Sequence, residues 1–292
     1  ETHYPPVLGT VEFRTAIKTK LAKENEIEVE LDEIIVSNGA KQSIFNAVMT
    51  LVNPGDEVII PAPYWVSYPS MVHYAGGKVV SIESSAENHF KISAEQLESN
   101  INANTRLIIF SSPCNPSGSI MSTAEIEEWV KVLAKHPHVY GIADEIYEKI
   151  LFTDKPKSLG SYASLKGRIA TVNGLSKGYA MTGWRIGYMA GPKEWIQACE
   201  KYQGMISSGA NSVGQAAGAF ALNNPAAQEE VEKMRLSFYK RRQLMSEMIA
   251  DIHGMNCHEP QGAFYYFPDV SHYFGQATTE GKTIMNSDDL CM

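Results

Sequence analysis

The sequence predicts an α/β protein in which a mostly parallel sheet carries helices on both faces. Short runs of β-branched and other apolar residues alternate with longer segments of helical periodicity along the 292 residues. This alternation is typical of a parallel sheet wrapped by helices. Clusters of Gly, Pro, Asn and Asp separate the runs, as expected where the chain turns. The strands predicted on this basis cover residues 34–36, 57–60, 78–82, 106–110, 139–143, 169–172, 185–190 and 262–267.

The first half of the chain shows the strand and helix alternation most clearly. An apolar helical stretch from Gln42 to Val52 follows the first strand, and Asn53-Pro54-Gly55-Asp56 ends it. A second helix is predicted over residues 66–75 because Gly76-Gly77 follows it directly and the next apolar run begins at residue 78.

In the second half, the buried strand 106–110 leads into a Pro- and Gly-rich loop at residues 112–118. A long amphipathic helix is predicted from Pro225 to about Ile252, and the aromatic run 262–267 is typical of a late strand. Ser287 precedes two acids and is predicted to cap one more helix, of which Leu290-Cys291-Met292 would form the start.

Composition places the protein among ordinary globular proteins and argues against two classes of partner. The chain is 44% hydrophobic and 20% charged. Its net charge of -8 gives no basic surface for nucleic acid or for an anionic membrane. No apolar stretch is long enough to span a bilayer, and no signal-peptide pattern opens the sequence. The four cysteines are widely scattered, which favours free thiols in a reducing compartment such as the cytoplasm and gives no metal-binding spacing.

Several residues with chemical potential fall at one predicted edge of the sheet. In open α/β sheets, ligands bind at the carboxyl ends of the strands. The residues placed there are Gly39, Ala40, Lys41, Trp65, Asn115, Asp144, Tyr147 and Lys177.

Lys177 is the most informative of these residues. It lies among small residues in the loop from Gly174 to Gly187, eight positions before Arg185. Burial and nearby cations favour the neutral amine, which can act as a nucleophile and form a Schiff base with an aldehyde cofactor. Taken alone, it would be interpreted as a solvated loop lysine, as most lysines are, and the matching residues elsewhere in the chain favour the chemical role.

The motifs, taken in order, resemble those of the class I aminotransferases of pyridoxal phosphate fold type I, and most closely the bacterial aspartate and prephenate aminotransferases. The segments that carry the resemblance are Tyr4-Pro5-Pro6, Gly9, Phe13-Arg14, Pro63 to Pro69, Asn115 to Gly118, Asp144 to Tyr147 and Gly174 to Gly187. In this order they are specific, although each alone is a moderate motif.

The resemblance implies a role for each residue around a pyridoxal 5'-phosphate ring. Lys177 would bind the cofactor covalently and then move a proton at the substrate α-carbon. Asp144 would pair with the ring nitrogen, and Asn115 and Tyr147 would bind the ring's phenolate oxygen. Trp65 would stack on the ring. Considered singly, Asp144 could be a helix cap, Asn115 a turn residue and Trp65 a core aromatic.

The resemblance also implies a phosphate site and a shared active site. Gly39, Ala40 and Lys41 would open a helix whose free N–H groups favour an anion, and Arg185 would add a bidentate contact. Ser176 would assist, because Gly174 occupies a position where many relatives carry a phosphate-binding serine.

Tyr4 matches a tyrosine that reaches the phosphate of the neighbouring subunit, which implies a homodimer. A large cofactor-binding domain is expected over residues 1–238, with a seven-stranded sheet in which 185–190 runs antiparallel. Residues 239–292 would begin a small α+β domain.

Substrate choice is less constrained by the sequence. The expected reaction is a ping-pong transfer of the amino group of aspartate to a 2-oxo acid such as 2-oxoglutarate. Lys41 would hold the distal carboxylate, or would only neutralise phosphate or lie in solvent. Trp65 and Asn115 would also contact substrate. The family's α-carboxylate arginine, in an Arg-x-Ser strand, does not occur before Met292, so the chain is expected to be part of a longer protein.

Three alternatives to this function remain. The same residues suit aromatic, alanine or prephenate transamination, and they also suit β-elimination as in carbon–sulfur lyases. A non-catalytic binding protein that keeps the fold is the third alternative.

Overall fold

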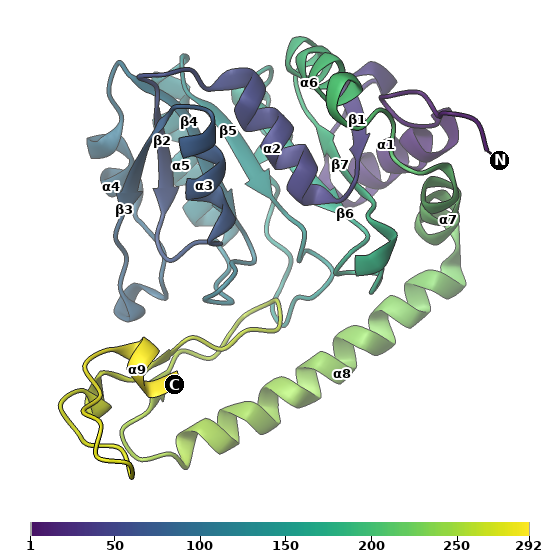
Figure 1. The fold of residues 1–292 in the computed structure, drawn as a ribbon. Helices are drawn as coiled ribbons and strands as arrows, with labels where there is room; N and C mark the ends of the chain where they lie inside the picture. The colour runs from purple at the N-terminus through teal and green to yellow at the C-terminus, as the bar shows by residue number, and fades with distance from the viewer. Residues whose placement is uncertain (1, 292) are drawn as a thin grey trace.

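The body of the protein is a seven-stranded sheet with helices on both faces (Figure 1). The computed structural model describes residues 2–291. The strands are β1 Ile34–Ser37, β2 Glu57–Pro61, β3 Lys78–Ile82, β4 Thr105–Ser111, β5 Tyr140–Asp144, β6 Ile169–Gly174 and β7 Gly187–Ala190. Their order is β1-β7-β6-β5-β4-β2-β3. Within this sheet, β7 runs antiparallel to both of its neighbours, β1 and β6, and the other neighbouring pairs are parallel. The predicted mostly parallel sheet with one antiparallel strand is confirmed.

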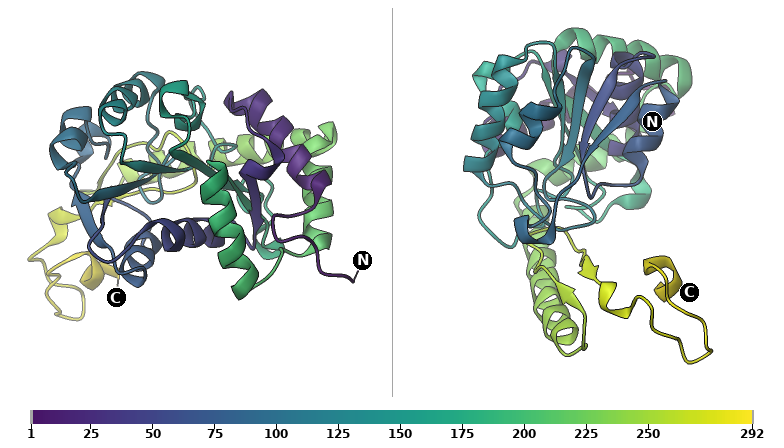
Figure 2. Two further views of the ribbon diagram at one scale, coloured as in Figure 1. Left: turned by 90° about the horizontal axis from the view of Figure 1, so that it is seen from above. Right: turned by 90° about the vertical axis from the view of Figure 1, so that its left-hand side faces the viewer.

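Nine α-helices surround or extend this sheet within residues 2–291. They are α1 Val11–Asn25, α2 Ala40–Leu51, α3 Ser67–Tyr74, α4 Ala94–Asn100, α5 Thr123–Lys135, α6 Lys193–Ile206, α7 Ser212–Asn223, α8 Pro225–Ala250 and α9 Ser287–Cys291. Helices α2, α3 and α6 cover one face, and α1, α4 and α5 lie on the other (Figure 2). No helix in this part of the chain combines the length and apolar character needed to cross a bilayer.

The alternation of side chains along the strands explains why both faces are covered. In β2, Val58 and Ile60 pack with α2 and α3, whereas Ile59 packs in the cluster under α4 and α5. In β4, Ile109 and Ile108 divide between the same two clusters. Successive residues of a strand point to opposite faces, so a strand that is apolar throughout needs cover on both.

Local sequence signals fix several helix ends. Thr10 caps α1 by accepting a hydrogen bond from the Phe13 N–H. Ser122 and Glu125 form a capping box at the start of α5, and Asn224 caps α8 ahead of Pro225. Such caps satisfy N–H groups that have no partner inside the helix.

Helix α8 carries the chain away from the sheet to a segment of little regular structure (Figures 1 and 2). In residues 251–291 the strands are the short pair β8 Asn256–Cys257 and β9 Pro268–Asp269. The predicted strand 262–267 is wrong. Ala263 has a left-handed backbone with φ 59°, which interrupts an extended strand. Backbone N–H groups here donate to Gly118 and Ile150 in distant loops instead.

The last helix also differs from its prediction. Ser287 is the first residue of α9, and Asn286 supplies the cap because its Oδ1 accepts from the Asp289 N–H at 3.0 Å. The Met292 end of the expected helix lies outside the described residues.

Candidate active site

A cleft of about 280 Å³ lies at the carboxyl ends of the central strands. It brings together nine of the eleven predicted site residues: Ala40, Lys41, Trp65, Asn115, Asp144, Tyr147, Ser176, Lys177 and Arg185. Gly39 lies beside it as the N-cap of α2. The remaining predicted residue, Tyr4, is 91% exposed and does not line the cleft.

Asp144 ends β5 at the floor of the cleft and is almost fully buried. The Tyr68 hydroxyl donates to its Oδ2 at 2.7 Å, and the Ile146 N–H donates to its Oδ1 at 3.2 Å. Burial raises the pKa of Asp144 to about 6, although both hydrogen bonds oppose the change. The ionised carboxylate is therefore a poorly solvated charge that a cationic ligand group would stabilise.

Lys177 lies in the loop after β6, on a single turn closed by the hydrogen bond from the Ala180 N–H to the Lys177 carbonyl. Its side chain is half-buried. The ammonium Nζ lies 5.8 Å from the ring centroid of Tyr147 and 5.5 Å from that of Phe264. Two aromatic rings thus lie near the amine, which shares its cleft with Asp144.

The N-terminus of α2 forms the anion-binding end of the cleft. Gly39 has φ 87° and no side chain to cap the helix, so the first N–H groups remain available to an anion. A Cβ on Gly39 would overlap the Arg185 guanidinium, and a Cβ on Gly187 would overlap the Ala40 backbone nitrogen. Both glycines therefore permit the helix start, strand β7 and the guanidinium to lie together.

Arg185 is turned toward this end by its own backbone. It has φ 53°, and its guanidinium donates to the Thr182 carbonyl at 2.8 Å and to the Asn38 carbonyl at 3.3 Å. Ser176 is buried beside it in the cleft lining. A Cβ on Gly174 would lie 2.8 Å from the Ile186 carbonyl oxygen, so a serine there would require the backbone to move.

Aromatic and amide side chains form the cleft walls. The Trp65 ring packs edge-on against Tyr68, with the centroids 5.4 Å apart. The Lys41 ammonium lies 4.7 Å from the centroid of the same indole ring. Asn115 lines the cleft from the loop after β4.

Two tyrosines that sequence reasoning missed belong to this site. Tyr68 bonds Asp144, as described above, and lies within the quoted motif Pro63 to Pro69. Tyr265 comes from the irregular segment after α8, and its hydroxyl lies 2.6 Å from that of Tyr147. Burial and this contact raise the pKa of Tyr147. The aromatic run 262–267 could have drawn attention to this segment, but the sequence does not show which of its rings enters the cleft.

Comparisons with known proteins agree with this geometry. The sequence model of the family "Aminotransferase class I and II" matches residues 1–287. A bifunctional aspartate aminotransferase and glutamate/aspartate-prephenate aminotransferase of Petunia hybrida is 45% identical over 99% of this chain and 61% of its own length. An aspartate aminotransferase of Rhizobium meliloti (strain 1021) is 44% identical over 100% of this chain and 71% of its own.

Solved structures extend the same likeness. The crystal structure of the Rhizobium meliloti aspartate aminotransferase superposes with a TM-score of 0.95, at 43% identity, covering 99% of this chain and 72% of that one. An aromatic aminotransferase from Pyrococcus horikoshii OT3 gives a TM-score of 0.89 at 36% identity, covering 92% and 72%. The chain belongs to the class I and II aminotransferase family, and it spans about 60–70% of the length of these curated relatives.

Proposed function

We propose that this member of the class I and II aminotransferase family binds pyridoxal 5'-phosphate in the cleft and transfers the amino group of aspartate to a 2-oxo acid such as 2-oxoglutarate. One observation carries the proposal: the Lys177 amine and the buried Asp144 carboxylate share a cleft that ends at a helix N-terminus and Arg185. The names of the relatives support aspartate as the donor.

The residues present fit such a cofactor. Its phosphate suits the α2 N-terminus, the Ser176 hydroxyl and the Arg185 guanidinium, which together offer hydrogen-bond donors and positive charge. Burial raises the pKa of Asp144, and a protonated ring nitrogen beside the carboxylate would stabilise its ionised form. When bound, the cofactor supplies an aldehyde that condenses with amines and a ring that accepts electrons.

The chain's own residues then divide the remaining work. Lys177 would hold the cofactor covalently and, when a substrate amine takes its place, would move the proton at the substrate α-carbon. Asp144 would keep the ring nitrogen protonated. Tyr147 and Asn115 would donate hydrogen bonds to the ring oxygen, and the flat Trp65 indole would orient the ring.

For the substrate, we propose that Lys41 binds the distal carboxylate of a dicarboxylic amino acid. Its ammonium lies over the Trp65 ring at the cleft lining, where its positive charge faces an anion bound in the cleft. Lys41→Met is expected to raise the KM for aspartate about tenfold or more, while the KM for alanine changes little. Equal changes for both donors would leave Lys41 with the phosphate alone.

We further propose a homodimer with a shared active site. Tyr4 is almost fully exposed and lies away from the cleft of its own chain, as expected of a side chain that serves the partner subunit. Cys114, Cys199, Cys257 and Cys291 are free thiols, which supports a reducing compartment such as the cytoplasm.

The reaction is tested by adding one amino donor to the purified protein loaded with pyridoxal 5'-phosphate and following the cofactor absorbance. Aspartate should convert the aldehyde form of the cofactor to its amine form, and 2-oxoglutarate should reverse the change. An unchanged spectrum with aspartate would remove it as the donor.

A donor and acceptor panel separates the alternatives. Prephenate is included as an acceptor because relatives carry it in their names. Release of ammonia and pyruvate from a cysteine-type donor would instead indicate a lyase. A protein that binds no cofactor covalently would be a non-catalytic relative.

A further inference from the structure

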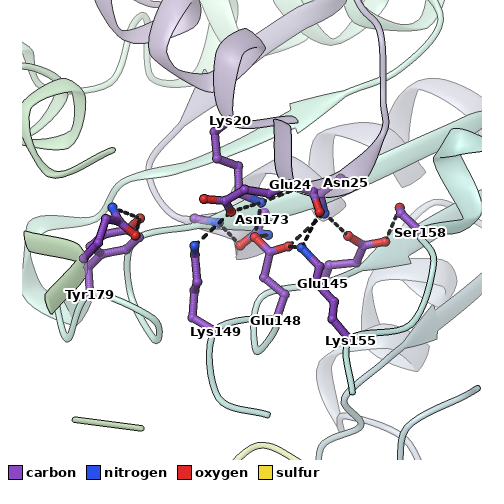
Figure 3. A network of polar contacts seen from close by, with 12 residues as sticks. Lys20, Glu24, Asn25, Glu145, Glu148, Lys149, Lys155, Ser158, Asn173 and Tyr179 are labelled. Atoms are coloured by element: carbon purple, nitrogen blue, oxygen red, sulfur yellow. Dashed lines mark hydrogen bonds and ion pairs between the residues drawn. The ribbon is translucent and has the colours of Figure 1, made fainter. Parts of the chain in front are cut away.

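A network of buried polar side chains connects helix α1 with the segment after β5 and with the end of β6 (Figure 3). Its members that matter here are Lys20 and Asn25 of α1, Glu148 after β5, and Asn173 of β6. All four are at most 8% exposed. None of them lines the cleft. The proposed reaction therefore assigns no role to these four residues.

Glu148 is the centre of the network. Its Oε1 accepts hydrogen bonds from Lys20 and, at 2.7 Å, from the Asn173 amide. Its Oε2 accepts from the Asn25 amide at 2.8 Å and from Lys155 at 3.0 Å. Burial opposes ionisation, but the charges of Lys20 and Lys155 hold the pKa of Glu148 below its usual range.

The bond to Asn173 connects the two loops that supply the proposed catalytic groups. Glu148 follows Tyr147 directly in the segment that begins with Asp144. Asn173 accepts the Gly174 N–H on its Oδ1 at 2.7 Å while its amide donates to Glu148. Gly174 is the last residue of β6, directly before the loop that holds Lys177. One carboxylate and one amide therefore fix the start of the lysine loop against the segment of Asp144.

Stability alone is a poor explanation for this arrangement. Placing charges in the interior carries a large desolvation cost, and well-packed apolar residues often stabilise a fold as well as a buried ion pair does. Apolar packing has little directional preference, whereas hydrogen bonds set both distance and angle. A displacement of about 1 Å between reacting groups can lower a rate about 100-fold. Hydrogen bonds that fix the position of the lysine loop would therefore protect the reaction rate.

We propose that Glu148 and Asn173 are positioning residues, which hold the Lys177 loop in register with Asp144 and Tyr147 without touching substrate or cofactor. This proposal rests on the proposed function, because the relative position of these residues affects a rate only if they take part in the reaction. The connection itself is made by protein atoms alone.

The test compares Asn173→Ala with the matched control Lys155→Met. The first change removes both bonds of the connection and leaves the Lys20–Glu148 pair intact. The second removes a cation from the other oxygen of the same carboxylate and leaves the connection in place. Two readouts are used: amide hydrogen exchange at residues 174–178 of the cofactor-free protein, and kcat and KM for the amino donor.

Asn173→Ala is expected to raise exchange at residues 174–178 at least about tenfold, confined to that loop. It should also lower kcat about 10- to 100-fold with KM within about twofold of wild type. Lys155→Met should resemble wild type in both readouts. If Asn173→Ala shows wild-type exchange and wild-type kcat, the proposal is overturned. Exchange that is faster throughout the protein with an unchanged kcat would also overturn it, because that result indicates a purely structural role.

If Asn173→Ala does not fold, Asn173→Ser gives the same comparison, because its hydroxyl is too short to make both bonds. A wild-type protein that transaminates no donor would defeat the proposed function. The exchange comparison needs no turnover, so it would still decide whether the connection orders the lysine loop.

Discussion

Replacing Asp144 by asparagine should stabilise the cofactor-free protein while it destroys activity. The carboxyl is 4% exposed, and burial raises its pKa from 3.8 to about 6. A carboxyl with a raised pKa binds its proton in the folded state at pH values where the unfolded chain has released it. The contribution of Asp144 to wild-type stability therefore falls as the pH rises from about 4 to about 6.

The size of the effect follows from that pKa difference. At about 1.4 kcal/mol per pH unit, the change from 3.8 to about 6 corresponds to about 3 kcal/mol. Asparagine resembles the protonated acid in shape and charge and does not titrate. Asp144→Asn should thus match wild type near pH 4 and exceed its free energy of unfolding by about 3 kcal/mol at pH 8.

Urea unfolding of the cofactor-free proteins across this pH range measures the difference. Tyr68→Phe is the matched control: it removes the hydroxyl that donates to Asp144 and should lower stability at pH 8 more than at pH 4. Other carboxyls titrate equally in all three proteins. An Asp144→Asn variant that is no more stable than wild type at pH 8, or equally shifted at every pH, would refute the reasoning.

Three further predictions concern single side chains. Lys177→Ala should lower turnover by at least about 10⁴-fold while non-covalent cofactor binding persists, measured by steady-state assay and absorbance after gel filtration; near-normal turnover would refute its assigned role. Tyr265→Phe removes the hydroxyl beside Tyr147 and should lower kcat about fivefold, the equivalent of about 1 kcal/mol; unchanged kcat at saturating donor would contradict this. Gly187→Ala should weaken cofactor affinity about tenfold or more in a fluorescence titration, because its Cβ would collide with the backbone at the start of α2. The control Gly183→Ala places its Cβ in open space and should bind the cofactor as wild type does.

The sheet is predictable from sequence because its signals are local. The predicted strand 57–60 and the observed β2 Glu57–Pro61 differ by one residue, since a short β-branched run bounded by turn residues can form little else. The run 185–190 is a partial exception. β7 begins only at Gly187 because Arg185 takes a left-handed backbone that points its guanidinium to the α2 N-terminus.

Elements held by distant partners are not predictable in this way. The segment 262–267 is apolar and aromatic like a strand, but the backbone N–H groups of Gly262 and Ala263 donate to loops more than 100 residues away. The contact of Tyr265 with Tyr147, and the connection of Glu148 to Asn173, depend on the same kind of long-range folding. The domain boundary between residues 238 and 239 stays a prediction.

The candidate site lies between these cases. The motifs select Lys177, Asp144, Asn115 and Arg185, and the carboxyl-end rule for α/β sheets explains why residues so far apart in sequence share one cleft. Sequence could not show that Gly174 has no room for a side chain, because the obstruction is the backbone of the adjacent strand.

The central claim is that Lys177 binds pyridoxal 5'-phosphate covalently beside Asp144. Borohydride reduction of the cofactor-loaded protein, followed by digestion and mass spectrometry of the peptides, tests it most directly. The account predicts a stable cofactor label on Lys177. Absence of a label, or a label on another lysine such as Lys41, would contradict it.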